Sequence, residues 1–209
     1  MRNLVVLLIL FVTLDLSPLA YGATADNAIA FHWYSTKPPL SLTGPQGQDD
    51  ITLNRGNLYR FTYLHRFDRV GVEAGISSLS SSTKPSYDLG NGVRADYRFK
   101  YSEVRLPVAV KYFFHPGGFD LYAGLGTGLY RAELKARVAT SAGYVYADSG
   151  TSIGPEFRIV FGGDFRFTEH CAIGVEIGRC WCRYDFGEFI GDSQTVSYGN
   201  PTLFIQYQF

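Results

Sequence analysis

The sequence predicts an all-β fold, an eight-stranded antiparallel up-and-down transmembrane β-barrel, and three observations support this. The 209 residues include 16 Phe, 15 Tyr and 23 Gly, a composition typical of strands joined by turns. Eight stretches alternate apolar and polar residues, each over about ten residues, the length that a tilted strand needs to cross a bilayer. The connections between them are alternately short and long, as in an up-and-down barrel.

The N-terminal segment has the order of a secretory signal. Arg2 is followed by an apolar run over residues 4–14 and then by the small-residue sequence Ala23-Thr24-Ala25, a cleavage-site pattern. The apolar run is too short to span a bilayer as a helix. We therefore expect residues 1–25 to be a cleaved signal peptide, with a cut after Gly22 as the alternative, and residues 26–209 to form the barrel domain.

The eight predicted strands follow one another along the mature chain. They cover residues 28–35, 57–67, 70–80, 103–114, 119–132, 156–167, 171–184 and 198–209. Residues 68–69, 115–118 and 168–170 are predicted tight turns, whereas residues 36–55, 81–102, 133–155 and 185–197 are predicted long loops. Both termini are then expected at the short-turn end of the barrel.

The two faces of these strands differ in composition. One face carries large apolar side chains such as Phe61, Leu125 and Ile177, and the other carries glycines among charged residues of both signs. The apolar face has more bulk than a narrow eight-stranded interior holds, whereas glycine makes room there. A soluble lipocalin-like barrel with its apolar face inward is the alternative. We expect the charged face to point inward.

The inward face predicts an ionic network in the lumen. Its expected members are the acids Glu73, Glu103, Glu156, Asp164 and Glu176 and the bases Arg60, Arg66, Arg105, Lys111, Arg158 and Arg166. Five acids against six bases nearly balance, as buried charges require. The centre of the network is expected at Glu103, Arg105, Glu156 and Arg158.

Aromatic residues edge the apolar face near the strand ends. They are Trp33, Tyr59, Phe67, Tyr112, Phe157, Phe167, Trp181 and Phe209. Such rings favour the boundary between lipid and water. The membrane barrel is therefore favoured over the soluble one.

The last strand alternates large apolar residues up to a terminal phenylalanine. These residues are Leu203, Ile205, Tyr207 and Phe209. The pattern resembles the C-terminal signature of bacterial outer-membrane barrels. Together with residues 121–128 and 163–167, it makes the chain similar to the broad superfamily of small barrels like the transmembrane domain of OmpA. The resemblance implies integral location in a Gram-negative outer membrane, with outer-membrane lipid, lipopolysaccharide and the barrel assembly machinery as partners.

Two departures from that superfamily matter. The chain is expected to lack the periplasmic peptidoglycan-binding domain of full-length OmpA proteins. Pro107 and Pro201 fall within predicted strands, where proline cannot donate to the ladder of hydrogen bonds. Each is expected to mark either a bulge or a strand boundary.

Residues for catalysis or metal binding are few. Lipid A deacylases of similar size are marked by a His-x-Ser pair. None of His32, His65, His115 and His170 is followed two positions later by Ser. Asp49 and Asp50 are expected to be solvated, because calcium prefers six or more oxygens, and no His or Cys cluster has zinc spacing. Cys171, Cys180 and Cys182 are expected to be free thiols. We expect no catalytic residue, cofactor or metal.

The leading hypothesis for function is a non-enzymatic outer-membrane barrel with a polar, largely plugged lumen and four long surface loops in structural or surface-interaction roles. A narrow porin-like channel for small solutes is the alternative, and a lipid A-modifying enzyme is less favoured. Basic and acidic residues are equal at 19 each, so nucleic acid is not an expected partner. A monomer is expected because a closed barrel has no free edge.

Overall fold

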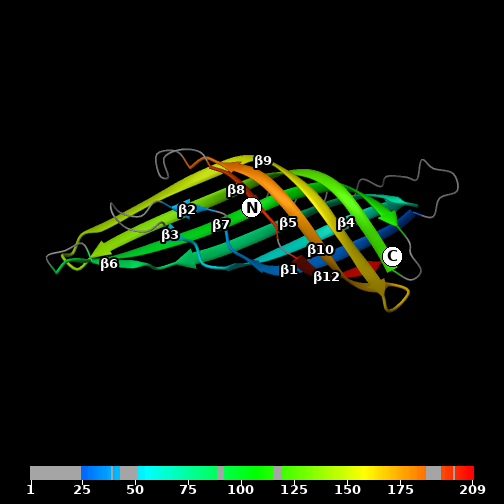
Figure 1. Cartoon of the computed structure of the whole chain (residues 1–209), viewed down its shortest axis with the longest axis horizontal. Coiled ribbons are helices and arrows are strands. Elements are labelled where there is room, and N and C mark those ends of the chain that lie inside the picture. The colour runs from blue at the N-terminus through cyan, green and yellow to red at the C-terminus, as the bar shows by residue number, and fades with distance from the viewer. Residues whose placement is uncertain are drawn as a thin grey trace.

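The computed structural model describes residues 25–38, 40–42, 51–88, 92–114, 119–186, 194–199 and 201–209, and they form strands and connecting turns (Figure 1). The strands are β1 (Ala25–Thr36), β2 (Ser41–Leu42), β3 (Ile51–Thr52), β4 (Gly56–Phe67), β5 (Val70–Thr83), β6 (Ser86–Asp88), β7 (Arg94–Phe114), β8 (Phe119–Thr140), β9 (Val145–Arg166), β10 (Cys171–Tyr184), β11 (Gln194–Tyr198) and β12 (Pro201–Gln208). No described helix is long and apolar enough to cross a membrane. The predicted signal peptide lies outside the described residues, apart from Ala25.

The strands close into a ring. Neighbours pair antiparallel in the order β1, β4, β5, β7, β8, β9, β10 and β12, and β12 pairs with β1 to complete the circle. β11 continues the course of β12, because both pair with β10 in one register, Cys180 opposite Tyr198 and Ile177 opposite Pro201. The predicted eight-stranded antiparallel barrel is therefore confirmed.

The side chains alternate between a lipid-facing outer surface and a filled interior. Outward residues such as Phe61 and Leu125 are 60% and 58% exposed, whereas the charged and small residues between them are mostly buried. A band of exposed large apolar side chains of this extent is what a lipid-facing surface requires. The predicted orientation of the two faces is confirmed.

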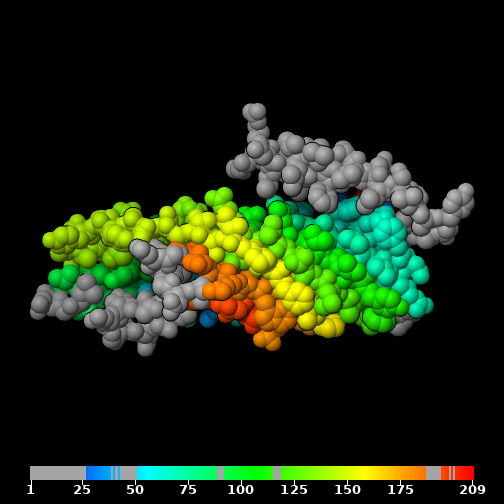
Figure 2. Space-filling view, turned by 90° about the horizontal axis from the view of Figure 1, so that it is seen from above, coloured from blue at the N-terminus to red at the C-terminus, as the bar shows by residue number. Residues whose placement is uncertain are grey.

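Three neighbouring strands are much longer than predicted. β7, β8 and β9 contain 21, 22 and 22 residues, about twice the number that a bilayer crossing needs. Their far ends project from the barrel at the left of Figures 1 and 2, where β8 and β9 are yellow-green. The predicted strands 103–114, 119–132 and 156–167 are thus too short. We call the outer part of these strands, residues 94–102, 131–140 and 145–153, the projecting sheet.

The predicted long loop 133–155 is wrong for most of its length. Val138 pairs with Tyr146, and the chain reverses in a short turn where Gly143 has a φ of 91°, a conformation that glycine adopts freely. Part of the predicted loop 81–102 is also strand, since β5 reaches Thr83 and β7 begins at Arg94. On β7 and β8 the alternation continues, but charged residues replace apolar ones on the outward face, so the apolar criterion ended these strands too early.

The two prolines behave differently. Pro201 is the first residue of β12, so the predicted strand boundary is confirmed there. Pro107 lies inside β7 opposite Gly128 of β8 with no bulge. The pairing of β7 with β5 skips two positions near Pro107 and resumes in the same register. The absence of a proline N–H thus interrupts the hydrogen bonds between β5 and β7 without shifting the register of the two strands.

Candidate functional site

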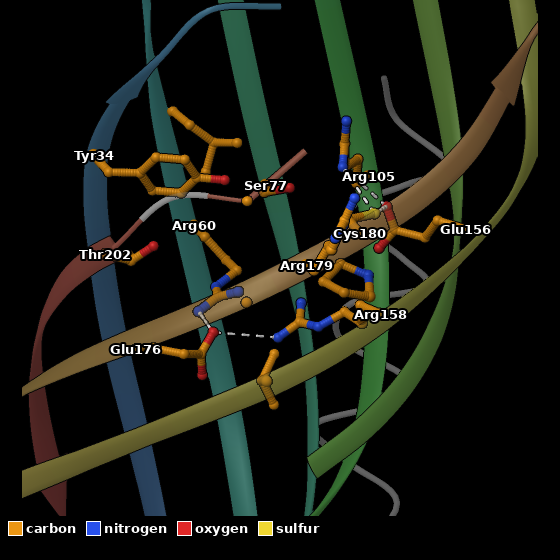
Figure 3. Close-up of a pocket in the computed structure, with 15 residues that line it drawn as sticks. Tyr34, Arg60, Ser77, Arg105, Glu156, Arg158, Glu176, Arg179, Cys180 and Thr202 are labelled. Atoms are coloured by element: carbon orange, nitrogen blue, oxygen red, sulfur yellow. Dashed lines mark hydrogen bonds and ion pairs between the residues drawn. The ribbon is translucent and has the colours of Figure 1, made fainter. Parts of the chain in front are cut away.

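The centre of the lumen holds a network of five charged side chains from five strands. The Arg60 guanidinium donates to Glu176 Oε1 at 2.6 Å. Lys111 Nζ lies 2.6 Å from Glu73 Oε2 and 2.9 Å from Glu176 Oε2. Arg158 Nη2 is 3.3 Å from Glu73 and 3.5 Å from Glu176. Figure 3 shows Arg60 and Arg158 converging on the carboxylate of Glu176.

Neutral groups complete this network. The Tyr122 hydroxyl donates to Glu176 Oε2 at 2.9 Å. His32 accepts from the Arg60 guanidinium at 2.7 Å through Nδ1, and its Nε2 lies 3.1 Å from the Thr62 hydroxyl. Each carboxylate oxygen of Glu176 therefore has at least two partners, as a buried charge requires.

A second cluster lies on the outer side of the first. Arg105 contacts Glu103 at 2.6 Å and Glu156 at 3.2 Å. The Tyr184 hydroxyl donates to Glu103 at 2.7 Å, and the Cys180 thiol donates to Glu156 at 3.4 Å. Three of the four residues expected at the network centre are therefore together here. Arg158 belongs to the first cluster, whose most connected carboxylate is Glu176.

A third group of charges lies at the short-turn end. Asp120 accepts from Arg66 at 2.6 Å and from Arg166 at 3.1 Å. The Arg166 side chain is 40% exposed, so this expected member of the network lies at its solvent-exposed edge. Asp164 is buried, but its Oδ1 has no hydrogen-bond partner among the described residues. Arg166 and Asp164 lie near the last inward positions of β9, where the wall ends.

The sequence prediction missed Asp120. It occupies an inward position of β8, in phase with Tyr122 and Gly124, so strict use of the alternation would have found it. With Asp120 included, the described inward charges balance. They are Glu73, Glu103, Asp120, Glu156, Asp164 and Glu176 against Arg60, Arg66, Arg105, Lys111, Arg158 and Arg166.

Above the charged clusters the interior becomes apolar. Leu79, Tyr101, Tyr130 and Leu134 from the wall strands are 0–1% exposed and pack in one cluster. The cluster also contains residues that flank or form the β2–β3 hairpin, Leu40, Leu42, Ile51 and Leu53. This segment was predicted to be an open surface loop. Its alternating Leu and Ile residues are the signal that could have placed it against the wall.

Little space is left between the two layers. A cavity of about 50 Å³ lies among Tyr34, Arg60, Arg105, Glu156, Arg158 and Cys180 (Figure 3), which is room for a few water molecules. Large side chains also occupy the space beside two glycines of the wall. A Cβ on Gly174 would lie 2.2 Å from the Phe204 ring, and one on Gly162 would lie 2.4 Å from Tyr122.

The remaining predicted sites lie in different parts of the barrel. Leu203, Ile205, Tyr207 and Phe209 are on the lipid-facing side of β12 and its end, each about half exposed, and their role as an assembly signal stays a prediction. Cys171, Cys180 and Cys182 are free. No group of three or more His, Cys, Asp or Glu side chains in the described part of the chain could hold a metal ion. Asp49, Asp50 and His115 lie outside the described residues.

Comparison with protein families identifies the kind of protein. Residues 6–209 match the family model of the outer membrane protein beta-barrel domain. The chain belongs to this family. It is therefore an integral outer-membrane β-barrel protein, and the soluble lipocalin-like alternative is wrong. No curated protein sequence matched the chain significantly.

Solved structures of outer-membrane proteins share the fold. A major outer-membrane protein of Thermus thermophilus has a TM-score of 0.53 at 11% identity, covering 89% of this chain and 100% of that one. OprG from Pseudomonas aeruginosa has a TM-score of 0.51 at 13% identity, covering 90% and 97%. Neisserial surface protein A has a TM-score of 0.48 at 15% identity, covering 90% and 100%. These likenesses concern the fold alone.

Proposed function

We propose that the protein is a non-enzymatic outer-membrane barrel with a closed lumen, and that its function is a surface interaction made by its parts outside the membrane. The observation that carries the proposal is the contrast between a filled interior and a projecting sheet. A transport protein of this size needs a path through the lumen, whereas a surface protein needs an exposed platform.

The charged layer supports a closed lumen. Glu73, Glu176 and their three cationic partners reach across the interior from five different strands. Removing one member of such a network leaves a buried charge without its partner, at a cost of about 3–5 kcal/mol. The side chains of this layer are therefore held in the path that a solute would take.

The apolar layer supports the same conclusion. The β2–β3 segment contributes Leu42 and Leu53, 5% and 1% exposed, to the cluster inside the outer end of the barrel. Withdrawing them would expose apolar surface at about 25 cal/mol per Å². The segment is thus expected to stay packed rather than open as a gate.

Single-channel recording in planar bilayers tests the proposal. The full mature protein should give no persistent open current. A stable, discrete conductance in the wild-type protein would overturn the closed lumen and establish the alternative, a narrow channel for small solutes. A variant that removes both layers, Glu176→Ala with Leu53→Ala, provides the positive control, because it should leak if these layers are the barrier.

The enzymatic alternative has its own test. A lipid A-modifying enzyme would change the mass of lipid A in cells that overproduce the protein. We expect an unchanged lipid A mass spectrum. His32 supports this expectation, because both of its ring nitrogens contact lumen groups, Arg60 and Thr62, rather than a serine.

A further inference from the structure

The outward face of the projecting sheet carries an excess of positive charge. Its basic residues include Arg98 and Lys100 on β7 and Arg131, Lys135 and Arg137 on β8, all exposed. We call these five residues the basic ladder. Across the whole chain acidic and basic residues are equal at 19 each, so this excess is local to the sheet.

The ladder places like charges directly opposite each other. Arg98 pairs with Arg137 and Lys100 with Lys135 across the β7–β8 register. Directly opposite residues on antiparallel strands have Cβ atoms about 5 Å apart, so like charges there repel and destabilise the sheet. Folding alone does not account for this arrangement.

The acids on the same face do not neutralise the ladder. Glu133 pairs with Lys135 at 3.0 Å, and Asp96 pairs with Arg94, which lies beyond the ladder. Within the described ranges, Arg98, Lys100, Arg131 and Arg137 form no ion pair. Four guanidinium and ammonium groups thus face outward with their hydrogen-bond donors available.

The neighbours of the ladder are small hydroxyl residues. Ser82 of β5 lies opposite Lys100, and Ser149 and Thr151 of β9 lie opposite Lys135 and Glu133. These side chains are exposed and can donate hydrogen bonds to an anion. Their short side chains leave the longer basic groups accessible.

The ladder is continuous with the lipid-facing band. Arg131 is the next outward residue after Leu129, which is 60% exposed, and it lies opposite Val104 and Ile153. From Arg131 to Arg137 the strand advances about 20 Å, or about 15 Å in height at the tilt of a membrane strand. A lipid whose chains contact Leu129 would therefore have its headgroup alongside the ladder.

We propose that the basic ladder binds the phosphorylated saccharide headgroup of an outer-leaflet glycolipid, lipopolysaccharide. The inference rests on the proposed surface function and names its partner. Arginine and lysine are the side chains that bind phosphate, and the position of the ladder just outside the hydrophobic band selects a membrane-anchored anion over a soluble one.

The test compares two double variants that remove the same charge. Arg98→Gln with Arg137→Gln alters the ladder, and Lys37→Gln with Arg55→Gln removes two exposed bases near the β2–β3 segment. Each full-length mature protein is refolded in zwitterionic detergent and titrated with lipopolysaccharide, with the same glycolipid after removal of its phosphates, and with a soluble sulfated polysaccharide. The readout is the apparent Kd at two salt concentrations.

We expect the ladder variant to bind lipopolysaccharide at least tenfold more weakly than wild type, with a smaller salt dependence, and the control variant to bind within twofold of wild type. Wild type should lose the same tenfold when the phosphates are removed. Equal binding by both variants, or equal binding of dephosphorylated glycolipid, would overturn the proposal. Binding of the sulfated polysaccharide in preference to lipopolysaccharide would overturn the glycolipid assignment. Bilayer conductance does not depend on the ladder, so failure here is distinct from failure of the closed lumen.

Discussion

The same strands carry two groups of charged side chains that are arranged in opposite ways. In the lumen, six acids face six bases and all but Arg166 are buried. On the outward face of the projecting sheet and of the neighbouring β6, the basic ladder and Arg94 outnumber the described acids, which are Asp88, Asp96 and Glu133. β7 contributes to both groups, with Glu103 and Arg105 inward and Arg98 and Lys100 outward.

The difference follows from solvation. A charge taken out of water must be neutralised within the fold, because its desolvation costs several kcal/mol. A hydrated charge has no such requirement, and exposed ion pairs contribute about 1 kcal/mol or less. The balance of acidic and basic side chains in the lumen is therefore required for folding. The imbalance on the outward face is the charge that the proposed partner would neutralise.

The largest expected effect comes from breaking the lumen network. Glu176→Gln removes the carboxylate that contacts Arg60, Lys111 and Arg158, and should destabilise the barrel by about 3–5 kcal/mol. Urea unfolding in detergent, followed by the loss of the fast-migrating folded band on unheated gels, measures it. Glu133→Gln on the outward face is the control and should change stability by less than about 1 kcal/mol. Equal effects would contradict the distinction between the two groups.

The apolar layer should be nearly as sensitive as the charged one. Leu134 is 0% exposed and packs inside the outer end of the barrel, so Leu134→Ala should cost about 2–5 kcal/mol. Leu129→Ala, five positions earlier and facing lipid, leaves no internal cavity. Proteolysis of the projecting sheet in native vesicles should accelerate for Leu134→Ala only. If both variants resist the protease equally, the apolar layer does not stabilise the projecting sheet.

A smaller effect is expected from crowding the interior. In Gly174→Ala the new Cβ would lie 2.2 Å from the Phe204 ring, and overpacking of this kind costs about 1–3 kcal/mol. Gly178→Ala is a matched control on the same face of β10, where the nearest atom is 3.2 Å away. Urea midpoints of the two variants measure the difference. A Gly174→Ala midpoint equal to that of Gly178→Ala would mean that Phe204 moves freely and that the lumen is less filled than we propose.

The ring of strands could be predicted from the sequence because period-two alternation and short turns are local signals. The inward charges were predictable for the same reason, and Asp120 would have been found by the same rule. The partners were not predictable, because which inward side chains meet depends on the stagger between strands. Arg158 was expected in one central group with Glu103, Arg105 and Glu156, but the register brings it to Glu73 and Glu176.

The projecting sheet was missed for a physical reason. On β7 all of its outward residues, and on β8 most of them, are charged or hydroxyl-bearing because they face water, so a search for apolar alternation ends at the membrane boundary. The inward residues of these two strands stay mostly apolar, with Phe99, Tyr101 and Leu134 buried. The β2–β3 segment was missed because its strands have two residues each, so its alternating Leu and Ile residues fall short of the ten-residue pattern by which the strands were predicted.

The smallest expected effect on stability tests the repulsion within the basic ladder directly. Removing one member of an opposed pair, in Arg137→Gln, relieves the repulsion with Arg98 and should stabilise the protein by less than about 1 kcal/mol. Because the repulsion is screened, the gain should shrink as salt rises from about 10 mM to 1 M. Lys37→Gln, an exposed base without an opposed partner strand, should show no such salt-dependent gain. Urea midpoints at both salt concentrations measure this effect. A destabilised Arg137→Gln protein would mean that the basic ladder stabilises the projecting sheet, and would count against a ladder that is available to bind an anion.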